Sequence, residues 1–331
     1  MSRLTCSVAM ATYNGAKFIE EQLRSIENQT IKPDEVVICD DGSKDSTVAI
    51  IEDFIKKSPL NISLHRNKEN LGFYKNFEKS ISLCKGDIVF LCDQDDSWLP
   101  IKIERMMTEF KNKDVVYVFS DAYVTDEHLN VTIKSILETY NFDWAALDRQ
   151  SFFDKAQSRV FPLGFQAACR RDFLEKIMPF IAAHDRWIAC CAPVFGDVKV
   201  INDKLVFYRR HTAATSYTAG SGRKVGLIKR IVDTDYYRFF LYPNKEKIIY
   251  SKVVEYIESG ESELDKNGIE NHLKYVNALV NAKDRGIIFR LRTLNKLKQE
   301  GLHLQFRGSG KTYMLDCIFM VVNSFKRKTK R

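Results

Sequence analysis

Residues 86–100 read Gly-Asp-Ile-Val-Phe-Leu-Cys-Asp-Gln-Asp-Asp-Ser-Trp-Leu-Pro, and they combine an apolar run with a cluster of acidic residues. Its apolar run, Ile88–Cys92, is typical of a short strand buried on both faces of a sheet. Three aspartates, Asp93, Asp95 and Asp96, follow that run. Residues two apart on an extended chain point the same way, with Cα atoms about 6.7 Å apart, so Asp93 and Asp95 are expected to face one site. The stretch predicts an acidic site at the end of a buried strand.

Such a cluster needs a counter-charge, because two like charges about 4 Å apart repel by about 4 kcal/mol at an effective dielectric constant near 20. A divalent cation, Mg²⁺ or Mn²⁺, supplies that charge and prefers oxygen ligands. The alternative is a solvated turn in which Asp96 or Ser97 only caps the next helix. The cluster taken by itself leaves both interpretations open.

Short apolar runs alternate with amphipathic helical stretches on either side of this cluster. The expected strands are Cys6–Ala11, Glu35–Cys39, Ile62–His65, Ile88–Cys92 and Val115–Phe119, and the expected helices are Ala16–Asn28, Ser46–Ile55, Phe73–Leu83 and Ile101–Phe110. This order predicts an α/β fold with a largely parallel sheet covered on both faces. Ligands of such sheets bind beyond the carboxyl ends of the strands. Polar residues do follow these strands: Thr12 and Asn14, Asp40 and Asp41, Asp93 to Asp96, and Asp121.

The alternation of strands and helices weakens from about residue 122 to residue 183. Beyond it the pattern indicates two strands and then only helices. Val198–Ile201 and Leu205–Tyr208 suggest two strands separated by Asn202 and Asp203. Four helical segments are expected further on: Lys224–Phe240, Lys245–Glu258, Glu263–Ala282 and Thr312–Lys326. Because residues 220–222 make a plausible linker, we expect one domain over residues 1–219 and a helical domain over residues 220–331.

The basic character of the chain belongs to its C-terminal part. The 331 residues carry a net charge of +8, whereas residues 283–331 carry +10 and the remainder −2. Hydrophobic residues at 45% and charged residues at 28% exclude a disordered chain, a collagen and a disulfide miniprotein. A nucleic-acid-binding protein is a rival suggested by the pI of 8.9, but an acidic site on a weakly acidic body repels phosphate unless a metal intervenes.

The eight cysteines form no C-x-x-C pair, and Cys6, Cys39 and Cys92 lie in apolar runs. Small buried thiols in a reduced cytosolic protein explain this pattern better than disulfides. We expect no signal peptide, because no charged segment followed by an apolar stretch opens the chain. We also expect no membrane span, because no run of about 18 apolar residues occurs.

Several motifs occur in a fixed order: Ser7–Asn14, Val36–Asp45, Asn70–Gly72, Gly86–Asp87 and Asp93–Asp96. Over about residues 5 to 212 this order resembles glycosyltransferase family 2, whose members have the GT-A fold and transfer a sugar from a nucleotide diphosphate. The stretch Asp93–Asp96 with Pro100 is similar to bacterial polysaccharide rhamnosyltransferases. The resemblance implies dTDP-L-rhamnose as the donor, with a UDP-hexose such as UDP-Gal, UDP-Glc or UDP-GlcNAc as the alternative. It also implies a saccharide or lipid-linked acceptor in cell-surface polysaccharide synthesis.

The resemblance assigns roles to residues by position. Nucleotide-sugar contacts are implied for Thr12, Tyr13, Asn14, Asp40, Asp41 and Asp93, with Asp41 accepting the imide N–H of the base. Asp95, Asp96 and His211 would hold Mn²⁺ or Mg²⁺, and Arg209 and Arg210 would face the diphosphate, in an order that the sequence leaves open. Phe165, Gln166 and Trp187 are weaker candidates for contacts with the acceptor.

An inverting sugar transfer also needs a general base that takes the proton of the acceptor hydroxyl. The stretch His184–Trp187 opens an apolar helix and is similar to the place where the family has that base, with His184 where many relatives have Glu. Asp185 is therefore the expected base. The alternative is that Asp185 only caps the helix, which contributes about 1 kcal/mol.

The C-terminal part contains two further motifs that could indicate a function. Gly308–Thr312 suggests a phosphate-binding P-loop, but Gln305 stands where that motif needs its first glycine. An apolar stretch from Tyr313 to Val322 precedes the basic run Lys326–Arg331, which favours a helix at the surface of an anionic membrane. We therefore expect a cytoplasmic protein peripheral to the inner face of the plasma membrane. Packing against a second subunit, which makes a homo-oligomer, remains the alternative.

A nucleotidyltransferase is the remaining rival, because it also joins metal-binding carboxylates to nucleotides. It needs a glycine-rich phosphate loop early in the chain, and residues 12–17 contain only Gly15. The two enzymes differ in their products, since the nucleotidyltransferase releases pyrophosphate and the glycosyltransferase releases a nucleoside diphosphate.

Overall fold

The computed structural model describes residues 3–140, 144, 147–157, 162–211, 243–262, 264–282, 285–302 and 317. The chain forms two compact units, residues 1–156 with 160–220 and residues 221–331 with 157–159. Of the expected features, the helix Lys224–Phe240, the glycine-rich Gly308–Thr312 and, apart from Cys317, the C-terminal tail lie outside the described residues.

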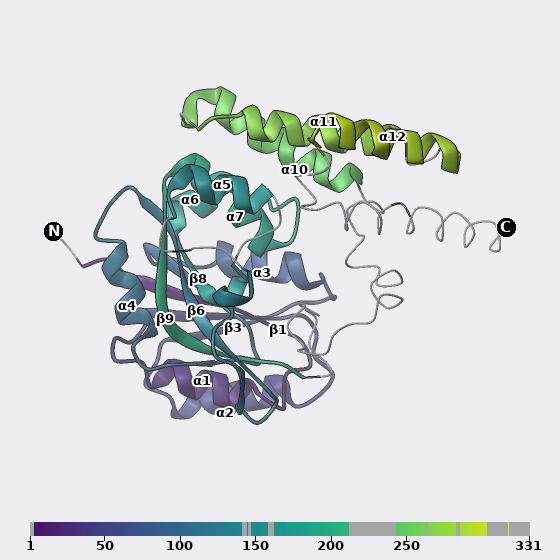
Figure 1. Cartoon of the computed structure of the whole chain (residues 1–331). Coiled ribbons are helices and arrows are strands. Elements are labelled where there is room, and N and C mark those ends of the chain that lie inside the picture. Colours follow the sequence, from purple (N-terminus) through teal and green to yellow (C-terminus); the bar gives the residue numbers. More distant parts are fainter. Residues whose placement is uncertain are drawn as a thin grey trace. The chain divides into compact units, whose positions relative to one another are not determined.

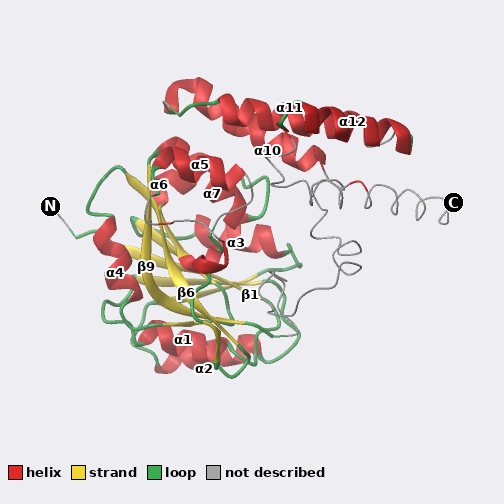
Figure 2. Cartoon of the chain, in the orientation of Figure 1, coloured by secondary structure: helices red, strands yellow, loops and turns green. Residues whose placement is uncertain are grey.

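The first half of the larger unit is a parallel α/β sheet, as the alternating pattern predicts (Figures 1 and 2). Its strands lie in the order β3-β2-β1-β4 and run parallel throughout. Their bounds are β1 Cys6–Thr12, β2 Glu35–Asp40, β3 Ile62–Arg66 and β4 Ile88–Cys92; the helices between and after them are α1 Ile19–Glu27, α2 Thr47–Lys57, α3 Phe73–Ser82 and α4 Lys102–Glu109. Helices α1 and α2 cover one face of this sheet and α3 covers the other. The predicted α/β fold is confirmed.

The second half of the sheet is mixed, which the sequence pattern did not predict. Strand β8, Ala167–Arg170, lies antiparallel between β4 and β6, Val115–Thr125. Strand β9, Asp197–Arg209, then pairs parallel with β6, and the two run side by side as the longest strands of the sheet (Figure 2). The short strands β5, Ser97–Trp98, and β7, Val131–Ile133, pair antiparallel with β9 and β6. Helices α5 Arg149–Gln157, α6 Arg171–Ile177 and α7 His184–Phe195, with the 3₁₀ turns Leu137–Tyr140 and Gly164–Gln166, complete the described part of this half.

The two strands expected around Asn202 and Asp203 are one continuous strand. Ser120 pairs with Ile201 and the next residue, Asp121, pairs with Lys204, so Asn202 and Asp203 bulge out of a single β9. The polar pair marks an irregularity inside the strand rather than a turn between two strands.

The parallel strands end at one edge of the sheet, where the site was expected. Strands β4 and β6 are both antiparallel to β8 and so run the same way, and β9 follows β6. The end of β1 at Thr12 is paired with Asp40 at the end of β2. Asp121 is a correction, because β6 continues to Thr125 and leaves Asp121 inside the strand, where its carboxylate accepts hydrogen bonds from the backbone of Ala122 and Leu137.

The cysteines pack as small apolar side chains. All eight are free, seven are buried and Cys317 is partly exposed. Burial raises the pKa of the Cys6 and Cys39 thiols to about 11, so these groups stay protonated and unreactive near neutral pH.

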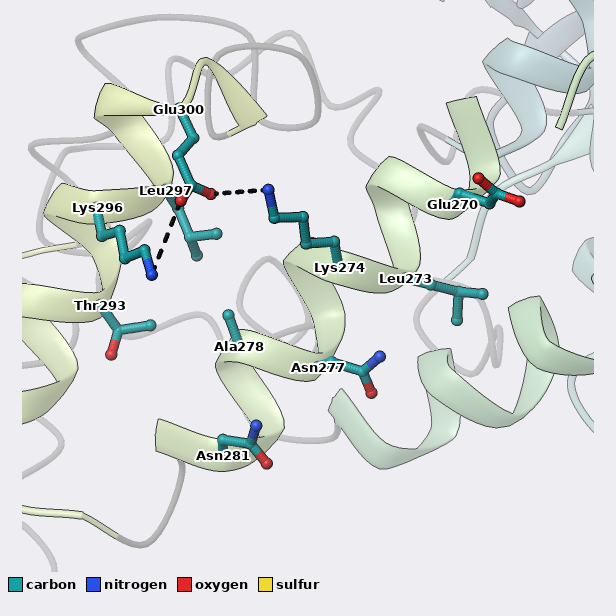
Figure 3. A pocket seen from close by; sticks show the side chains of 10 residues that line it. All are labelled: Glu270, Leu273, Lys274, Asn277, Ala278, Asn281, Thr293, Lys296, Leu297 and Glu300. Carbon is teal, nitrogen blue, oxygen red and sulfur yellow. Dashed lines mark ion pairs between the residues drawn. The ribbon is translucent and has the colours of Figure 1, made fainter. Parts of the chain in front are cut away.

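The smaller unit consists of helices in its described part. These are α10 Pro243–Tyr256, a π-helical turn Ile257–Glu261, α11 Asn267–Ala282 and α12 Ile287–Gln299. Tyr250 of α10 contacts His272 of α11, with ring centroids 4.1 Å apart. A hollow of about 530 Å³ lies along α11 and α12, where Glu300 pairs with Lys274 and Lys296 at 3.5 and 3.9 Å (Figure 3). Within the described residues, no helix is both long and apolar enough to cross a membrane.

Candidate active site

Asp40 closes the turn that follows β2. Its Oδ1 accepts hydrogen bonds from the backbone N–H groups of Gly42 and Ser43 at 3.1 and 2.9 Å. Its Oδ2 accepts from the hydroxyls of Thr12 and Ser43 at 2.9 and 2.5 Å. A carboxylate has about four acceptor positions, so these bonds occupy Asp40 fully. Asp40 and Thr12, both expected to touch the nucleotide, are buried and bind each other. They shape the turn that presents Asp41.

Asp41 anchors a second loop at the same edge. Its Oδ1 accepts from Asn67 Nδ2 and from the backbone N–H of Leu71, each at 2.8 Å, and its Oδ2 accepts from the backbone N–H of Gly72 at 2.9 Å. Asn70 donates to the Asp41 carbonyl at 2.9 Å. These bonds leave about one acceptor position on Oδ2, which matches the single N–H that a nucleotide base would donate.

Gln94 joins the loop after β1 to the loop after β4, and the sequence analysis missed it. Its side chain accepts from the Tyr13 N–H at 2.9 Å and donates to the Tyr13 carbonyl at 3.1 Å. A Cβ atom on Gly15 would lie 2.2 Å from Gln94 Oε1, so a larger residue there would displace the Gln94 side chain from Tyr13. Tyr13 is 47% exposed, and Asn14 accepts from the backbone N–H of Lys44 at 2.8 Å. A glutamine between aspartates carries no signal that would have revealed this role.

The loop after β4, which we call the acidic loop (Asp93–Asp96), holds carboxylates against the protein interior. Burial raises the pKa of Asp93 to about 8, and the negative charges of Asp95 and Asp185 add to the effect. Asp96 is fully buried, and burial with the charges of Asp95 and Asp93 raises its pKa well above the ordinary value. Asp96 Oδ1 accepts from the Arg209 N–H at 3.0 Å, whereas its Oδ2 is buried without a partner among the described residues.

Two buried cations lie behind the acidic loop. Arg209 at the end of β9 donates from Nε to the Asp95 carbonyl at 2.8 Å and pairs with Glu21. Lys102 of α4 is fully buried and donates to the Phe165 carbonyl at 2.6 Å. Burial lowers the pKa of Lys102 to about 7, although the neighbouring Cys92 and Asp96 favour its charged form. Part of the counter-charge that we assigned to a metal is therefore supplied by the protein.

This arrangement corrects the role expected for Arg209. Its guanidinium also donates to the Glu127 carbonyl at 2.5 Å and lies over the Phe18 ring at 4.6 Å. With only 3% of its surface exposed, Arg209 supports the acidic loop from within rather than facing a diphosphate. Arg210 follows it, with its backbone N–H bound to the Thr125 carbonyl at 3.0 Å and its side chain half-buried.

Asp95 and His211 meet although 116 positions separate them, with Nε2 of His211 2.8 Å from Oδ2 of Asp95. The Phe18 ring, 4.6 Å from the His211 ring, packs beside the histidine. No group of three or more His, Cys, Asp or Glu side chains is arranged as a metal site within the described residues. The pair nevertheless fits a divalent cation, because Mg²⁺-type ions bind one or two protein ligands and take the rest from phosphate oxygens and water. Asp96, also expected as a ligand, lies deeper than this pair.

Asp185 lies in the first turn of α7, close enough to Asp93 for its charge to contribute to the raised pKa of that carboxyl. Its Oδ1 accepts from the backbone N–H of Arg186 at 2.7 Å. The preceding His184 stacks on Phe77 with ring centroids 4.1 Å apart, and its two ring nitrogens are buried without hydrogen-bond partners among the described residues. Burial lowers the pKa of His184, so the neutral ring acts as a flat packing element beneath Asp185.

The three side chains expected at the acceptor are buried, which corrects that expectation. Phe165 stacks on Tyr208 at 4.4 Å, and Gln166 donates to the Ser120 carbonyl at 2.8 Å. Trp187 donates from Nε1 to the Ile177 carbonyl at 2.8 Å. None of the three is more than 1% exposed, so they hold the interior behind Asp185 and offer an acceptor no surface.

The model of the family described as glycosyl transferase family 2 matches residues 7–178, more than half of the chain. The chain is a family 2 glycosyltransferase. An uncharacterized glycosyltransferase of Nostoc is 28% identical over 222 residues, which cover 65% of this chain and 67% of the relative. A cholesterol galactosyltransferase of Borreliella burgdorferi is 29% identical over 136 residues, covering 41% of this chain and 37% of the relative.

Two solved structures share the fold of this glycosyltransferase. Residues 1–349 of TarS from S. aureus, in complex with UDP-GlcNAc, superpose with a TM-score of 0.59 at 16% identity, covering 98% of this chain and 92% of that one. The mannosyltransferase PcManGT of Pyrobaculum calidifontis, in complex with GDP-Man and Mn²⁺, gives a TM-score of 0.52 at 18% identity, covering 98% and 88%.

The family match ends at residue 178, before three residues of the candidate active site. Asp185 on α7 and Arg209 and His211 at the end of β9 lie beyond the matched region. The structure of the glycosyltransferase nevertheless brings them to the acidic loop through the Asp95–His211 contact, the Arg209 hydrogen bonds and the charge of Asp185. The site is therefore completed by elements outside the part that defines the family.

Proposed function

We propose that this enzyme transfers a sugar from a nucleoside-diphosphate sugar to a saccharide hydroxyl, with inversion at the anomeric carbon. The observation that carries the proposal is the meeting of Asp95 and His211 beside Asp93, whose pKa the Asp185 charge raises. A donor site and a candidate base thus share one edge of the sheet.

On the donor side, Asp41 accepts an N–H of the base through its remaining acceptor position, and the exposed Tyr13 packs against the nucleoside. Asp95 and His211 are the residues that would hold Mn²⁺ or Mg²⁺. Such a cation, when bound, neutralises charge on the diphosphate of the leaving group. Asp93 faces the ribose, while Arg209 holds the Asp95 carbonyl from behind and the charge of Lys102 lies near Asp93 and Asp96.

On the acceptor side, Asp185 takes the proton of the attacking hydroxyl. The hydroxyl oxygen bonds to the anomeric carbon as the bond to the diphosphate oxygen breaks, and the nucleoside diphosphate departs with the electron pair. Attack from the side opposite the leaving group inverts the anomeric carbon. A positioned base of this kind contributes about 10²- to 10⁴-fold to the rate.

The sugar and its acceptor are finer proposals. Similarity of the acidic loop to polysaccharide rhamnosyltransferases supports dTDP-L-rhamnose, with UDP-hexoses as the alternative. The UDP-GlcNAc bound by TarS and the GDP-Man bound by PcManGT justify including both in any screen. A saccharide or lipid-linked acceptor in cell-surface polysaccharide synthesis is consistent with either donor.

We further propose that the enzyme is cytoplasmic and binds the inner face of the plasma membrane. Helix α12 supports this, since it carries Arg290, Arg292, Lys296 and Lys298 and no acidic residue, and exposes Ile288 and Phe289. Flotation with anionic liposomes should separate the full chain from a chain ending at Gly310. Equal flotation of the two would contradict a role for the tail.

A thermal-shift screen tests the donor proposal. The panel contains dTDP-L-rhamnose, UDP-Gal, UDP-Glc, UDP-GlcNAc and GDP-Man, each with Mn²⁺ or with EDTA. We expect one nucleotide class to raise the Tm with Mn²⁺ only, and the same donor to release nucleoside diphosphate. Release of pyrophosphate, or no stabilisation by any donor, would overturn the proposal.

A further inference from the structure

Large apolar side chains gather on the surface where α3 begins. Leu71, Phe73 and Tyr74 are 39%, 41% and 43% exposed, within four consecutive positions. Helical spacing places Phe73 on the same face as Phe77 and Ile81, which are buried. The apolar face of α3 therefore continues from the interior to the surface. Single exposed apolar residues are ordinary, but a contiguous group on a rigid element marks a binding site.

The protein fixes this group rigidly. The backbone N–H groups of Leu71 and Gly72 donate to the Asp41 carboxylate. Gly72 has φ of 80°, a left-handed conformation that glycine adopts readily, and the helix starts directly after it. The Phe73 ring lies edge-on to Tyr74 at 5.6 Å and to Phe77 at 5.5 Å. The Phe73 ring thus packs on the buried Phe77, and the Tyr74 ring packs on Phe73.

The group also borders the candidate base. Phe73 contacts the His184 ring edge-on, with centroids 5.2 Å apart, and the next residue is Asp185. Asp41 anchors the other side of the group. An acceptor whose hydroxyl reaches Asp185 must lie near this surface, and the buried Phe165, Gln166 and Trp187 cannot contact it.

We propose that Phe73 and Tyr74, flanked by Leu71, form a stacking platform for a sugar ring of the acceptor. The C–H bonds on one face of a pyranose carry partial positive charge, and the face of an aromatic ring is negative, so the two surfaces attract. Stacking orients the sugar without using its hydroxyls, which leaves one of them for Asp185. This inference rests on the proposed function and adds to it the class of ligand and the residues that bind it.

The test compares the wild-type chain with Phe73→Leu and Tyr74→Leu, which keep an apolar side chain but lose the ring. Ile248→Ala is the control for the loss of an exposed apolar side chain, because Ile248 is 56% exposed on α10. Saturation-transfer NMR measures binding of methyl pyranosides of glucose, galactose, rhamnose and N-acetylglucosamine, in the presence of Mn²⁺ and a nucleoside diphosphate. Release of nucleoside diphosphate without an acceptor measures the donor site separately.

We expect at least one pyranoside to bind the wild type and the Ile248→Ala variant through its ring protons. Loss of a ring should weaken that binding, and raise the acceptor KM, by about tenfold. The rate of donor hydrolysis should remain within twofold of the wild type. The Tm should equal that of the wild type within experimental error. Unchanged pyranoside binding in both variants, or no binding to the wild type, would overturn the platform. If the variants lost donor hydrolysis as strongly as pyranoside binding, the platform would also be overturned, because the two rings would then bind the donor. Failure of the wild type to hydrolyse any nucleotide sugar would instead remove the proposed function.

Discussion

Two acidic loops lie at the ends of β2 and β4, the parallel strands on either side of β1, and they use their carboxylates in different ways. Asp40 and Asp41 after β2 accept seven hydrogen bonds between them from the turn and from the loop Asn67–Gly72. Asp96 after β4 accepts one from the backbone of Arg209 and keeps a buried oxygen without a partner among the described residues.

The difference shows that carboxylates at strand ends can have two roles. At the end of β2 they stabilise the surrounding loops, whereas after β4 we expect them to bind the ligand. Backbone and side-chain donors occupy all four acceptor positions of Asp40 and about three of Asp41, so the charge of this pair is already stabilised by the protein. The second group is buried and crowded with like charge; burial first, and the charges of Asp95 and Asp185 second, raise the pKa of Asp93 to about 8. Two internal cations, Arg209 and Lys102, lie close to this loop, and the Asp95 carboxylate contacts His211 where we propose that an external cation binds.

The largest expected effect is a loss of turnover when the candidate base Asp185 is replaced. Asp185→Asn keeps the size and the hydrogen bond to Arg186 but removes the base, so kcat should fall on the order of 10³-fold. Nucleoside-diphosphate affinity, measured by calorimetry, should stay within twofold. Near-normal turnover of this variant would remove the assignment of Asp185 as the base.

A large effect on the free energy of unfolding is expected at Asp40. Asp40→Ala leaves two hydroxyls and two backbone N–H groups without their acceptor, and should lower the free energy of unfolding by about 3 kcal/mol. Urea denaturation measures it, with the exposed Asp53→Ala as the control. Equal stability of the two variants would contradict a structural role for Asp40.

A smaller loss is expected when the internal counter-charge is removed. Lys102→Met fills similar space but abolishes the bond to the Phe165 carbonyl and the charge near Asp96, at a cost of about 2 kcal/mol in unfolding free energy. Lys113→Met at an exposed lysine is the comparison in the same urea series. If Lys102→Met matched Lys113→Met, the acidic loop would not depend on Lys102.

The smallest effect is expected at Asp96 itself. Asp96→Ala loses one hydrogen bond but relieves repulsion with Asp93 and Asp95, so the free energy of unfolding should change by less than about 1 kcal/mol. Placed beside Asp40→Ala, it measures the contrast between the two loops directly. A loss as large as that of Asp40→Ala would show that both loops are built alike.

The alternating pattern predicted the parallel half of the sheet, because each strand there is a continuous apolar run followed by a helix. The same pattern failed at β8 and β9, whose pairing depends on contacts between distant segments rather than on local periodicity. It also placed Asp121 at a strand end, since nothing local showed that β6 continues to Thr125.

The candidate site was predictable in its residue types more than in its roles. The sequence pointed to Asp95 and His211, which the fold brings within 2.8 Å. It could not show that Arg209 and Phe165 turn inward, because burial is decided by tertiary packing. Lys102 and Gln94 were missed for the same reason, since each acts through a partner more than 60 positions away.

We propose that the acidic loop and the end of β9 form one diphosphate site that uses a divalent cation. Calorimetric titration with UDP, dTDP and GDP, each with Mn²⁺ or EDTA, tests it on the wild type, His211→Ala and Asp185→Asn. We predict binding of one nucleotide that needs Mn²⁺, weakens at least about tenfold in His211→Ala and persists in Asp185→Asn. Equal nucleotide affinity in Mn²⁺ and in EDTA, or an unchanged nucleotide affinity of His211→Ala, would contradict a cation-dependent diphosphate site.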